Sequence, residues 1–184
     1  MDRVRIGIIG CGGMSRHHGR VITRQIPGAE IVGLAEPNEA NLARFIKDVF
    51  DDPAAEPATF SDYRQLLEEI ELDGVILVTP HNQHFQQAMD AIDRGLHVMI
   101  EKPMVISTAD AKALIAHAEA NRKVVSVAFP GPFTREFQYI RKVIAAGELG
   151  EISGVTGVCA QQWIQNVGGS CTTAGRPCSP PRCI

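Results

Sequence analysis

A glycine-rich turn near the start of the chain is the first place where residue types and spacing could do chemistry. An apolar, β-branched run over residues 4–9 ends at Gly10, and a plausible helix begins after the segment 10–14. Gly10 can adopt the positive φ of a tight turn, and Gly12 lets the backbone approach a ligand closely. The following helix would turn its free N–H groups and positive dipole end toward an anion. The pattern is G-x-G-x-x-S, with Ser15 where Gly or Ala is usual, and it predicts a diphosphate-binding unit.

A carboxylate follows the next expected strand, which spans residues 31–35. Glu36 lies at the end of this strand, at about the spacing after the glycine turn where a dinucleotide site places an acidic residue on the ribose hydroxyls. A solvated carboxylate at a strand end is the alternative. An acidic side chain here would repel a ribose 2′-phosphate, so the sequence favours NAD over NADP as the cofactor.

Strands and helices alternate regularly beyond this point. A helix with an Asn38 N-cap is followed by an exposed acidic loop (51–58) and by a short helix after Asp62. An uninterrupted apolar strand is expected at 74–79, another apolar strand at 97–100 and one more strand at 124–129. The helices between them are expected to end at Gly95 and Asn121. The alternation predicts an α/β fold with a doubly wound parallel sheet. Ligands of such sheets bind at the carboxyl ends of the strands, where segments 10–14, 79–84 and 101–103 all fall.

Composition excludes several classes of protein. The 184 residues carry a net charge of −3, which gives no electrostatic basis for binding nucleic acid or an anionic membrane. No apolar run approaches the ~20 residues of a membrane span, and no signal-peptide pattern is present, so we expect a cytoplasmic protein. The five cysteines are expected to be free thiols. Cys171, Cys178 and Cys183 lack the paired spacing of metal ligands, and no metal site is predicted.

Three motifs together carry a resemblance to a known family. G-I-I-G-C-G-G-M, V-T-P-H-N-Q-H and G-L-H-V-M-I-E-K-P occur in this order, and E-K-P is the most specific. From about Arg3 to Val167 the sequence resembles the glucose–fructose oxidoreductase/inositol dehydrogenase (Gfo/Idh/MocA) family. The resemblance implies an NAD(P)-dependent oxidoreductase that moves a hydride between the nicotinamide and a hydroxyl carbon of a sugar or polyol. A homo-oligomer is possible, and a non-catalytic dinucleotide-binding module or nucleotide sensor remains the alternative.

The same resemblance implies roles for individual residues. Lys102 would be catalytic, because an ammonium beside a hydroxyl undergoing oxidation stabilises the developing alkoxide, and partial burial can lower a lysine pKa enough for proton transfer. An exposed turn lysine is the alternative for Lys102, and a helix-surface histidine is the alternative for His84. His17, His18 and His81 receive no role. The implied cofactor-binding residues are Gly10, Cys11, Gly12, Gly13 and Met14 at the pyrophosphate, Glu36 at the adenosine ribose, Thr79, Pro80 and His84 on the nicotinamide side, and Glu101 and Lys102 at the nicotinamide ribose.

We expect three parts along the chain. Residues 1–129 would form the Rossmann domain, 130–167 the incomplete start of an α+β substrate domain, and 168–184 a disordered tail. The second part should contain a helix ending at Gly147 and a strand over 151–162. Family members commonly draw a proton-relay Asp and His from that domain, and this sequence has neither residue type after His117. The expectation is therefore a truncated chain whose own turnover is in doubt.

Overall fold

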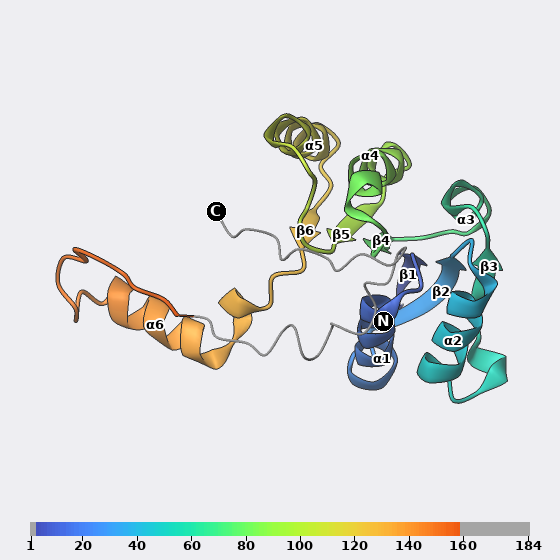
Figure 1. Cartoon of the computed structure of the whole chain (residues 1–184), viewed down its shortest axis with the longest axis horizontal. Helices are drawn as coiled ribbons and strands as arrows, with labels where there is room; N and C mark the ends of the chain where they lie inside the picture. Colours follow the sequence, from blue (N-terminus) through green and yellow to red (C-terminus); the bar gives the residue numbers. More distant parts are fainter. Residues whose placement is uncertain (1–2, 159–184) are drawn as a thin grey trace, which may run out of the picture. The chain divides into compact units, whose positions relative to one another are not determined.

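Parallel strand pairing organises the first compact unit, which extends to Pro132. The computed structural model describes residues 3–158. Six strands pair in parallel in the order β3-β2-β1-β4-β5-β6, and the strand order reverses between β1 and β4 (Figure 1). The strands are β1 (Val4–Ile9), β2 (Ala29–Ala35), β3 (Ala58–Phe60), β4 (Gly74–Leu77), β5 (His97–Ile100) and β6 (Val125–Val127). The expected doubly wound parallel sheet is confirmed.

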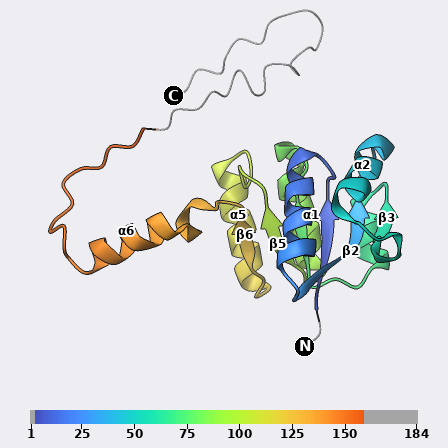
Figure 2. The same cartoon turned by 90° about the horizontal axis from the view of Figure 1, so that it is seen from below.

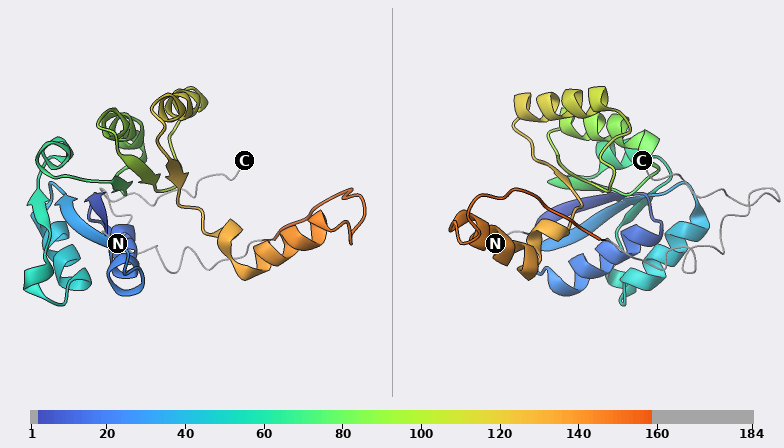
Figure 3. Two further views of the ribbon diagram at one scale, coloured as in Figure 1. Left: turned by 180° about the vertical axis from the view of Figure 1, so that it is seen from behind. Right: turned by 60° about the vertical axis from the view of Figure 1, so that its left-hand side comes forward.

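Helices cover both faces of this sheet. Figure 1 shows α1 and α2 on one face and α3, α4 and α5 on the other. Figure 2 looks onto the face that carries α1 and α2, and Figure 3 shows the layers from two further sides. The expected side-chain caps are present: Asn38 Oδ1 accepts from the Asn41 N–H group at 3.0 Å, and Asp62 and Ser107 begin α3 and α5 in the same way. The helices are α1 (Gly13–Gln25), α2 (Glu39–Val49), α3 (Tyr63–Glu69), α4 (His84–Asp93) and α5 (Thr108–Ala120), with 3-10 turns η1 (Pro53–Ala55), η2 (His81–Gln83) and η3 (Gly131–Phe133).

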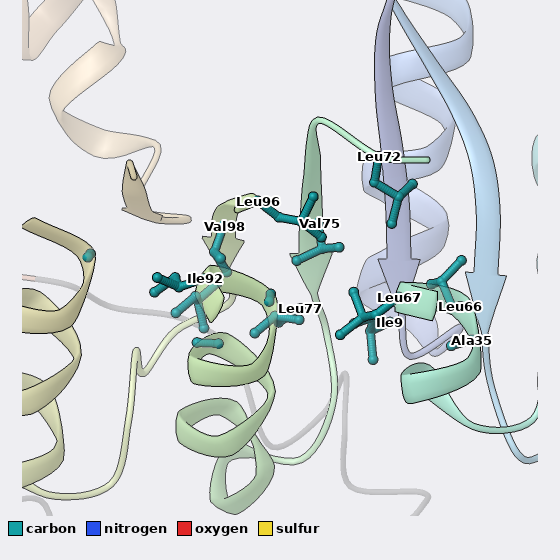
Figure 4. Packing of buried hydrophobic residues seen from close by; sticks show 14 of the residues in the cluster. Ile9, Ala35, Leu66, Leu67, Leu72, Val75, Leu77, Ile92, Leu96 and Val98 are labelled. Carbon is teal, nitrogen blue, oxygen red and sulfur yellow. The ribbon is translucent and has the colours of Figure 1, made fainter. Parts of the chain in front are cut away.

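The core consists of two apolar clusters, one on each face of the sheet. Ile8 packs with the cluster that contains Phe45 of α2, whereas Ile9 packs with the cluster that contains residues of α3, α4 and α5 (Figure 4). On β4, Ile76 joins the first cluster, and Val75 and Leu77 join the second. Adjacent residues of a strand point to opposite faces, so both faces of β1 and β4 are buried. This confirms the interpretation of the apolar run as a strand buried on both faces, although β4 ends at Leu77, two residues before the expected end at residue 79.

Two expectations about strands were wrong. A loop was expected up to residue 58, and β3 was not expected, because Ala58 and Thr59 are exposed and a three-residue edge strand shows no apolar alternation. The strand expected over 151–162 is not formed over 151–158, where the backbone is irregular and exposed; residues 159–162 lie outside the described part. A strand needs a backbone partner, and within the described residues none pairs with this segment.

The second unit begins at Phe133. It contains the expected helix, α6 (Arg135–Ala145), whose N-cap residue is Thr134 and which is followed by Gly147 with φ +74°. The side chains of Phe137, Ile140 and Ile144 on α6 are exposed. The expected disordered tail (168–184) lies outside the described residues, and the three-part division of the chain stays a prediction. Among the described residues, no helix is long and apolar enough to cross a membrane.

Close packing of α1 against α2 depends on Gly19. A Cβ atom at this position would lie 2.8 Å from Phe45 Cζ and 3.0 Å from both Val49 methyl groups. We therefore expect Gly19→Ala to lower the free energy of unfolding by about 1–2 kcal/mol, because overpacking outweighs the gain in helix propensity. Urea denaturation measures the change. Gly28→Ala, whose Cβ would meet nothing within 4 Å, is the matched control and should be close to neutral or slightly stabilising. Equal effects of the two substitutions would contradict this account of the packing.

Candidate dinucleotide site

A pocket of about 460 Å³ opens at the carboxyl ends of β1, β2 and β4. This is the edge of the sheet, beside the reversal of strand order, where open α/β sheets bind ligands. Several of the residues expected in the site line it, together with others that follow β2, β3 and β4. The lining residues are Ile9, Gly10, Gly12, Ala35, Glu36, Pro37, Asn41, Ser61, Asp62, Tyr63, Val78, Thr79, Pro80, Gln83 and Gln87.

The glycine turn has the geometry that the sequence predicts. Gly10 has φ +92°, and a Cβ atom there would lie 2.6 Å from the Val78 carbonyl oxygen, so only glycine fits. A Cβ atom at Gly12 or Gly13 would meet nothing within 4 Å, which leaves open space in front of α1. Ser15 is fully buried and its hydroxyl donates to the Gly12 carbonyl oxygen at 2.8 Å. The serine in the third small position therefore closes the turn through its own hydrogen bond.

The N-terminus of α1 is suited to an anion. Its N-cap is Gly12, which supplies no side-chain hydrogen bond, and the first turn contains no acidic residue. The first N–H groups of a helix lack intrahelical partners and carry the positive end of the helix dipole. Met14 lies in this first turn and is exposed. The role of Gly13 and Met14 at a diphosphate stays a prediction, which the chemistry of this helix end favours; neither residue is among those that line the pocket.

Cys11 has a different environment from its neighbours. Its side chain is fully buried in the α1–α2 cluster, and its N–H group donates to Glu36 Oε2 at 2.7 Å. Burial, together with the negative charge of Glu36, raises the pKa of the Cys11 thiol to about 12. The thiol is therefore neutral and unreactive, and Cys11 contributes to the site by orienting Glu36.

Glu36 is fixed at the rim of the pocket by two backbone groups. Its Oε2 accepts from Cys11 and its Oε1 accepts from the Asn38 N–H group at 2.9 Å. Each carboxylate oxygen has a second lone pair, so both can also accept from a ligand hydroxyl. The glycine turn and the carboxylate expected to bind ribose are thus joined directly.

Thr79 and Pro80 also line the pocket, but His84 does not. The His84 ring is fully buried, with Nε2 2.9 Å from the Thr79 carbonyl oxygen and Nδ1 3.0 Å from the Pro103 carbonyl oxygen. Both expectations for His84, a cofactor contact and a helix-surface position, assumed an accessible ring, and burial contradicts them. The side chain connects the segment after β4 to the segment after β5, which makes it a positioning residue.

Glu101 and Lys102 follow β5. Glu101 is only 7% exposed, and its Oε1 lies 2.7 Å from His18 Nε2. Its Oε2 accepts from the Lys102 N–H group at 3.2 Å and lies 3.5 Å from Lys102 Nζ. Burial alone would raise the pKa of the Glu101 carboxyl, but the hydrogen bonds from His18 and Lys102 and their charges outweigh it and hold the pKa below its usual value. The Lys102 side chain is 55% exposed, so its amine remains accessible to a substrate.

Sequence reasoning missed two groups of residues. His18 received no role, although it shares the inner face of α1 with the buried residues Ser15, Gly19 and Ile22. That spacing is a usable signal for burial, but nothing local indicates a partner 83 residues away. Residues 61–63 line the pocket because they follow β3, the strand that was not expected. Within residues 3–158, no group of three or more His, Cys, Asp or Glu side chains could hold a metal ion.

Comparison with known proteins shows which family the chain is related to. A family model described as "Oxidoreductase family, NAD-binding Rossmann fold" (GFO_IDH_MocA) matches residues 4–129. The chain belongs to this family. Over 151 residues it is 30% identical to inositol 2-dehydrogenase 4 of Saccharopolyspora erythraea, a match that covers 80% of this chain and 42% of that protein. It is also 30% identical over 151 residues to glucose-6-phosphate 3-dehydrogenase of Bacillus subtilis, covering 82% and 41%. The chain thus spans less than half the length of these relatives.

Solved structures support the same relationship. The WlbA dehydrogenase of Bordetella pertussis, in complex with NADH and UDP-GlcNAcA, is 27% identical, with a TM-score of 0.73 over 82% of this chain and 44% of that one. The scyllo-inositol dehydrogenase of Lactobacillus casei, with bound NAD(H) and scyllo-inositol, has a TM-score of 0.74 at 22% identity over 83% and 44%. The second likeness shows the fold alone.

The lowered pKa of Glu101 predicts a pH dependence of stability. Its ionised form is favoured in the folded state, so its contribution is fully present above the unfolded value of 4.5 and is lost as the pH falls below it. Glu101→Gln should therefore be less stable than the wild type at pH 7, and the gap in free energy of unfolding should narrow below pH 4.5. Urea denaturation across this range measures the gap. Glu119→Gln, at an exposed position of α5, is the control. A gap that stays constant would contradict the assignment.

Proposed function

We propose that this chain binds NAD(H) in the pocket at the carboxyl ends of β1, β2 and β4. The observation that carries the proposal is the glycine turn, which opens the N-terminus of α1 onto a pocket of about 460 Å³ whose rim holds Glu36. The diphosphate would lie against the first N–H groups of α1. The adenosine ribose would bind Glu36, and residues 61–63 would flank the adenine. Glu36 would repel a 2′-phosphate, so NAD is expected to bind more tightly than NADP.

The proposed activity is oxidoreduction of a sugar or polyol hydroxyl. When bound, the nicotinamide supplies the hydride acceptor, and the protein supplies position and charge. Lys102 would lie beside the hydroxyl that is oxidised, where its ammonium group stabilises negative charge developing on oxygen. Glu101 holds Lys102 through its Oε2, and His84 ties the following residues to the segment after β4. The relatives named for inositol and glucose 6-phosphate support this class of substrate.

A second candidate function is a dinucleotide-binding module without turnover. It is favoured by the exposure of Lys102, whose side chain is 55% exposed, because an ammonium group in contact with water stabilises a developing alkoxide only weakly. The two candidates agree on cofactor binding and differ only in hydride transfer. Adding NAD⁺ with a panel of polyols and sugars separates them, because only the oxidoreductase produces NADH absorbance.

Cofactor binding is tested with Gly12→Asp. The substitution places a carboxylate in the open space before α1, where the diphosphate would lie, and we expect NADH affinity to fall about tenfold or more. Aspartate is a good N-cap, so stability should stay within about 0.5 kcal/mol of the wild type. NADH fluorescence titration measures the affinity, with NADPH as the comparison ligand. Gly28→Asp adds the same charge at a position with equally open surroundings and should leave binding unchanged. Unaltered NADH affinity in Gly12→Asp would overturn the proposed diphosphate position.

The role of Lys102 is tested with Lys102→Met. Methionine keeps most of the side-chain length but removes the charge, so turnover should fall about a hundredfold or more while NADH affinity changes much less. Lys112→Met, at an exposed position of α5, is the control. The comparison uses the substrate with the highest rate in the panel. Equal losses of turnover and of NADH affinity would show that Lys102 supports binding rather than the reaction.

A further inference from the structure

One interaction connects the helix that begins at the glycine turn to the segment that follows β5. His18 lies on α1, and its side chain is only 17% exposed. Its Nε2 atom is 2.7 Å from Glu101 Oε1, and the two residues are 83 positions apart in the sequence. The contact is therefore a tertiary link between the proposed diphosphate-binding helix and the proposed nicotinamide-side segment.

The direction of this hydrogen bond follows from the state of Glu101. An ionised carboxylate can only accept hydrogen bonds, so the hydrogen lies on His18 Nε2. A neutral ring protonated at Nε2 and an imidazolium both satisfy this requirement. The other titratable groups facing the pair are Lys102, whose Nζ lies 3.5 Å from Glu101 Oε2, and His17, whose ring centroid lies 5.9 Å from that of His18.

Glu101 uses its second oxygen to hold Lys102. Oε2 accepts from the Lys102 N–H group and faces the Lys102 ammonium, whereas Oε1 is held by His18. The carboxylate is nearly buried and loses most of its hydration. Without the donor on His18, Oε1 would lose this charge-assisted hydrogen bond in a site that water scarcely reaches. The orientation of Glu101 would then be less restricted, and the pKa of its carboxyl would rise.

We propose that His18 is a positioning residue of the nicotinamide half of the site: by holding the Glu101 carboxylate from α1, it fixes the backbone and amine of Lys102. This inference rests on the proposed function, because it assigns the E-K-P segment to the nicotinamide side. The His18–Glu101 contact also connects the proposed diphosphate site to the proposed nicotinamide side, because α1 carries the diphosphate site at its start and His18 on its inner face. His18 itself touches neither the cofactor nor the substrate in this scheme.

The cofactor arm of the test compares NADH with ADP, which contains the adenosine and diphosphate but lacks the nicotinamide half. His18→Leu should weaken NADH about tenfold while leaving ADP affinity nearly unchanged. His18→Gln retains a donor at a similar position and should restore most of the NADH affinity. Thr23→Leu, at an exposed position of α1 away from the pair, is the control and should match the wild type. Equal weakening of both ligands in His18→Leu, or no rescue by His18→Gln, would reduce His18 to a packing role and overturn the proposal.

A second arm does not require a cofactor. The amide resonance of Lys102 in ¹⁵N–¹H NMR spectra reports the ionisation of Glu101, because this amide donates to Glu101 Oε2. The midpoint of its pH titration should move to higher pH in His18→Leu and return in His18→Gln, because burial raises the carboxyl pKa when the donor is absent. An unchanged midpoint in His18→Leu contradicts the proposal. If His18→Leu does not fold, the same titration of His18→Gln and His18→Asn decides, because asparagine is too short to reach Glu101 and should give the raised midpoint.

The two arms separate the failure of this inference from the failure of the proposed function. A wild-type chain that binds neither NADH nor ADP would refute the proposed cofactor site, and the NMR arm would still test the link from His18 to Lys102. A wild-type chain that binds NADH but is indifferent to His18→Leu in both arms would refute the inference alone.

Discussion

The close approach of the glycine turn to the end of β4 is the constraint on which the site depends. Gly10 passes so near the Val78 carbonyl oxygen that no side chain fits between them. This contact allows the chain to leave β1 and begin α1 at once, with the helix N-terminus directed at the pocket. The direction of α1 then decides where its inner face lies, and therefore where His18 meets Glu101. The close approach at Gly10 and the contact of His18 with Glu101 therefore lie at the start and on the inner face of the same helix.

Buried polar residues are concentrated at the same end of the sheet. The buried polar and charged residues in the described part of the chain are Ser15, His84, Gln87 and Glu101. Each has a hydrogen-bond partner in the glycine turn, in α1 or in the segment after β4. No buried side-chain nitrogen or oxygen in this part of the chain lacks a partner. Burial of a polar group costs free energy unless it is hydrogen-bonded, so these side chains favour one arrangement of the loops over others. The other buried side chains in the described part of the chain are apolar. Buried hydrogen bonds therefore restrict the loops at the edge of the sheet where the ligand is proposed to bind.

Local signals predicted the parts of this structure that local interactions form. The apolar run at 74–79, the N-caps at Asn38 and Ser107 and the glycine turn each depend on residues within a few positions, and each was confirmed. The edge strand β3 and the partner of His18 depend on segments brought together by folding, and no local pattern indicates them. His84 shows the limit most clearly: its place in a motif indicated importance, but only the tertiary structure shows that its ring is buried between two loops.

Cofactor binding and turnover place different demands on this chain. Every residue that lines the pocket belongs to the unit that ends at Pro132, so the pocket proposed for the dinucleotide lies within one compact unit. Lys102 is not among those residues, and more than half of its side-chain surface is exposed. A lysine in bulk water stabilises an alkoxide weakly, because charge interactions are strong only where water is excluded. Efficient hydride transfer would therefore need further protein surface over Lys102 to enclose the substrate, whereas binding of the dinucleotide would not. Affinity for NADH and turnover therefore depend on different parts of the protein surface, the pocket residues for the first and the surroundings of Lys102 for the second.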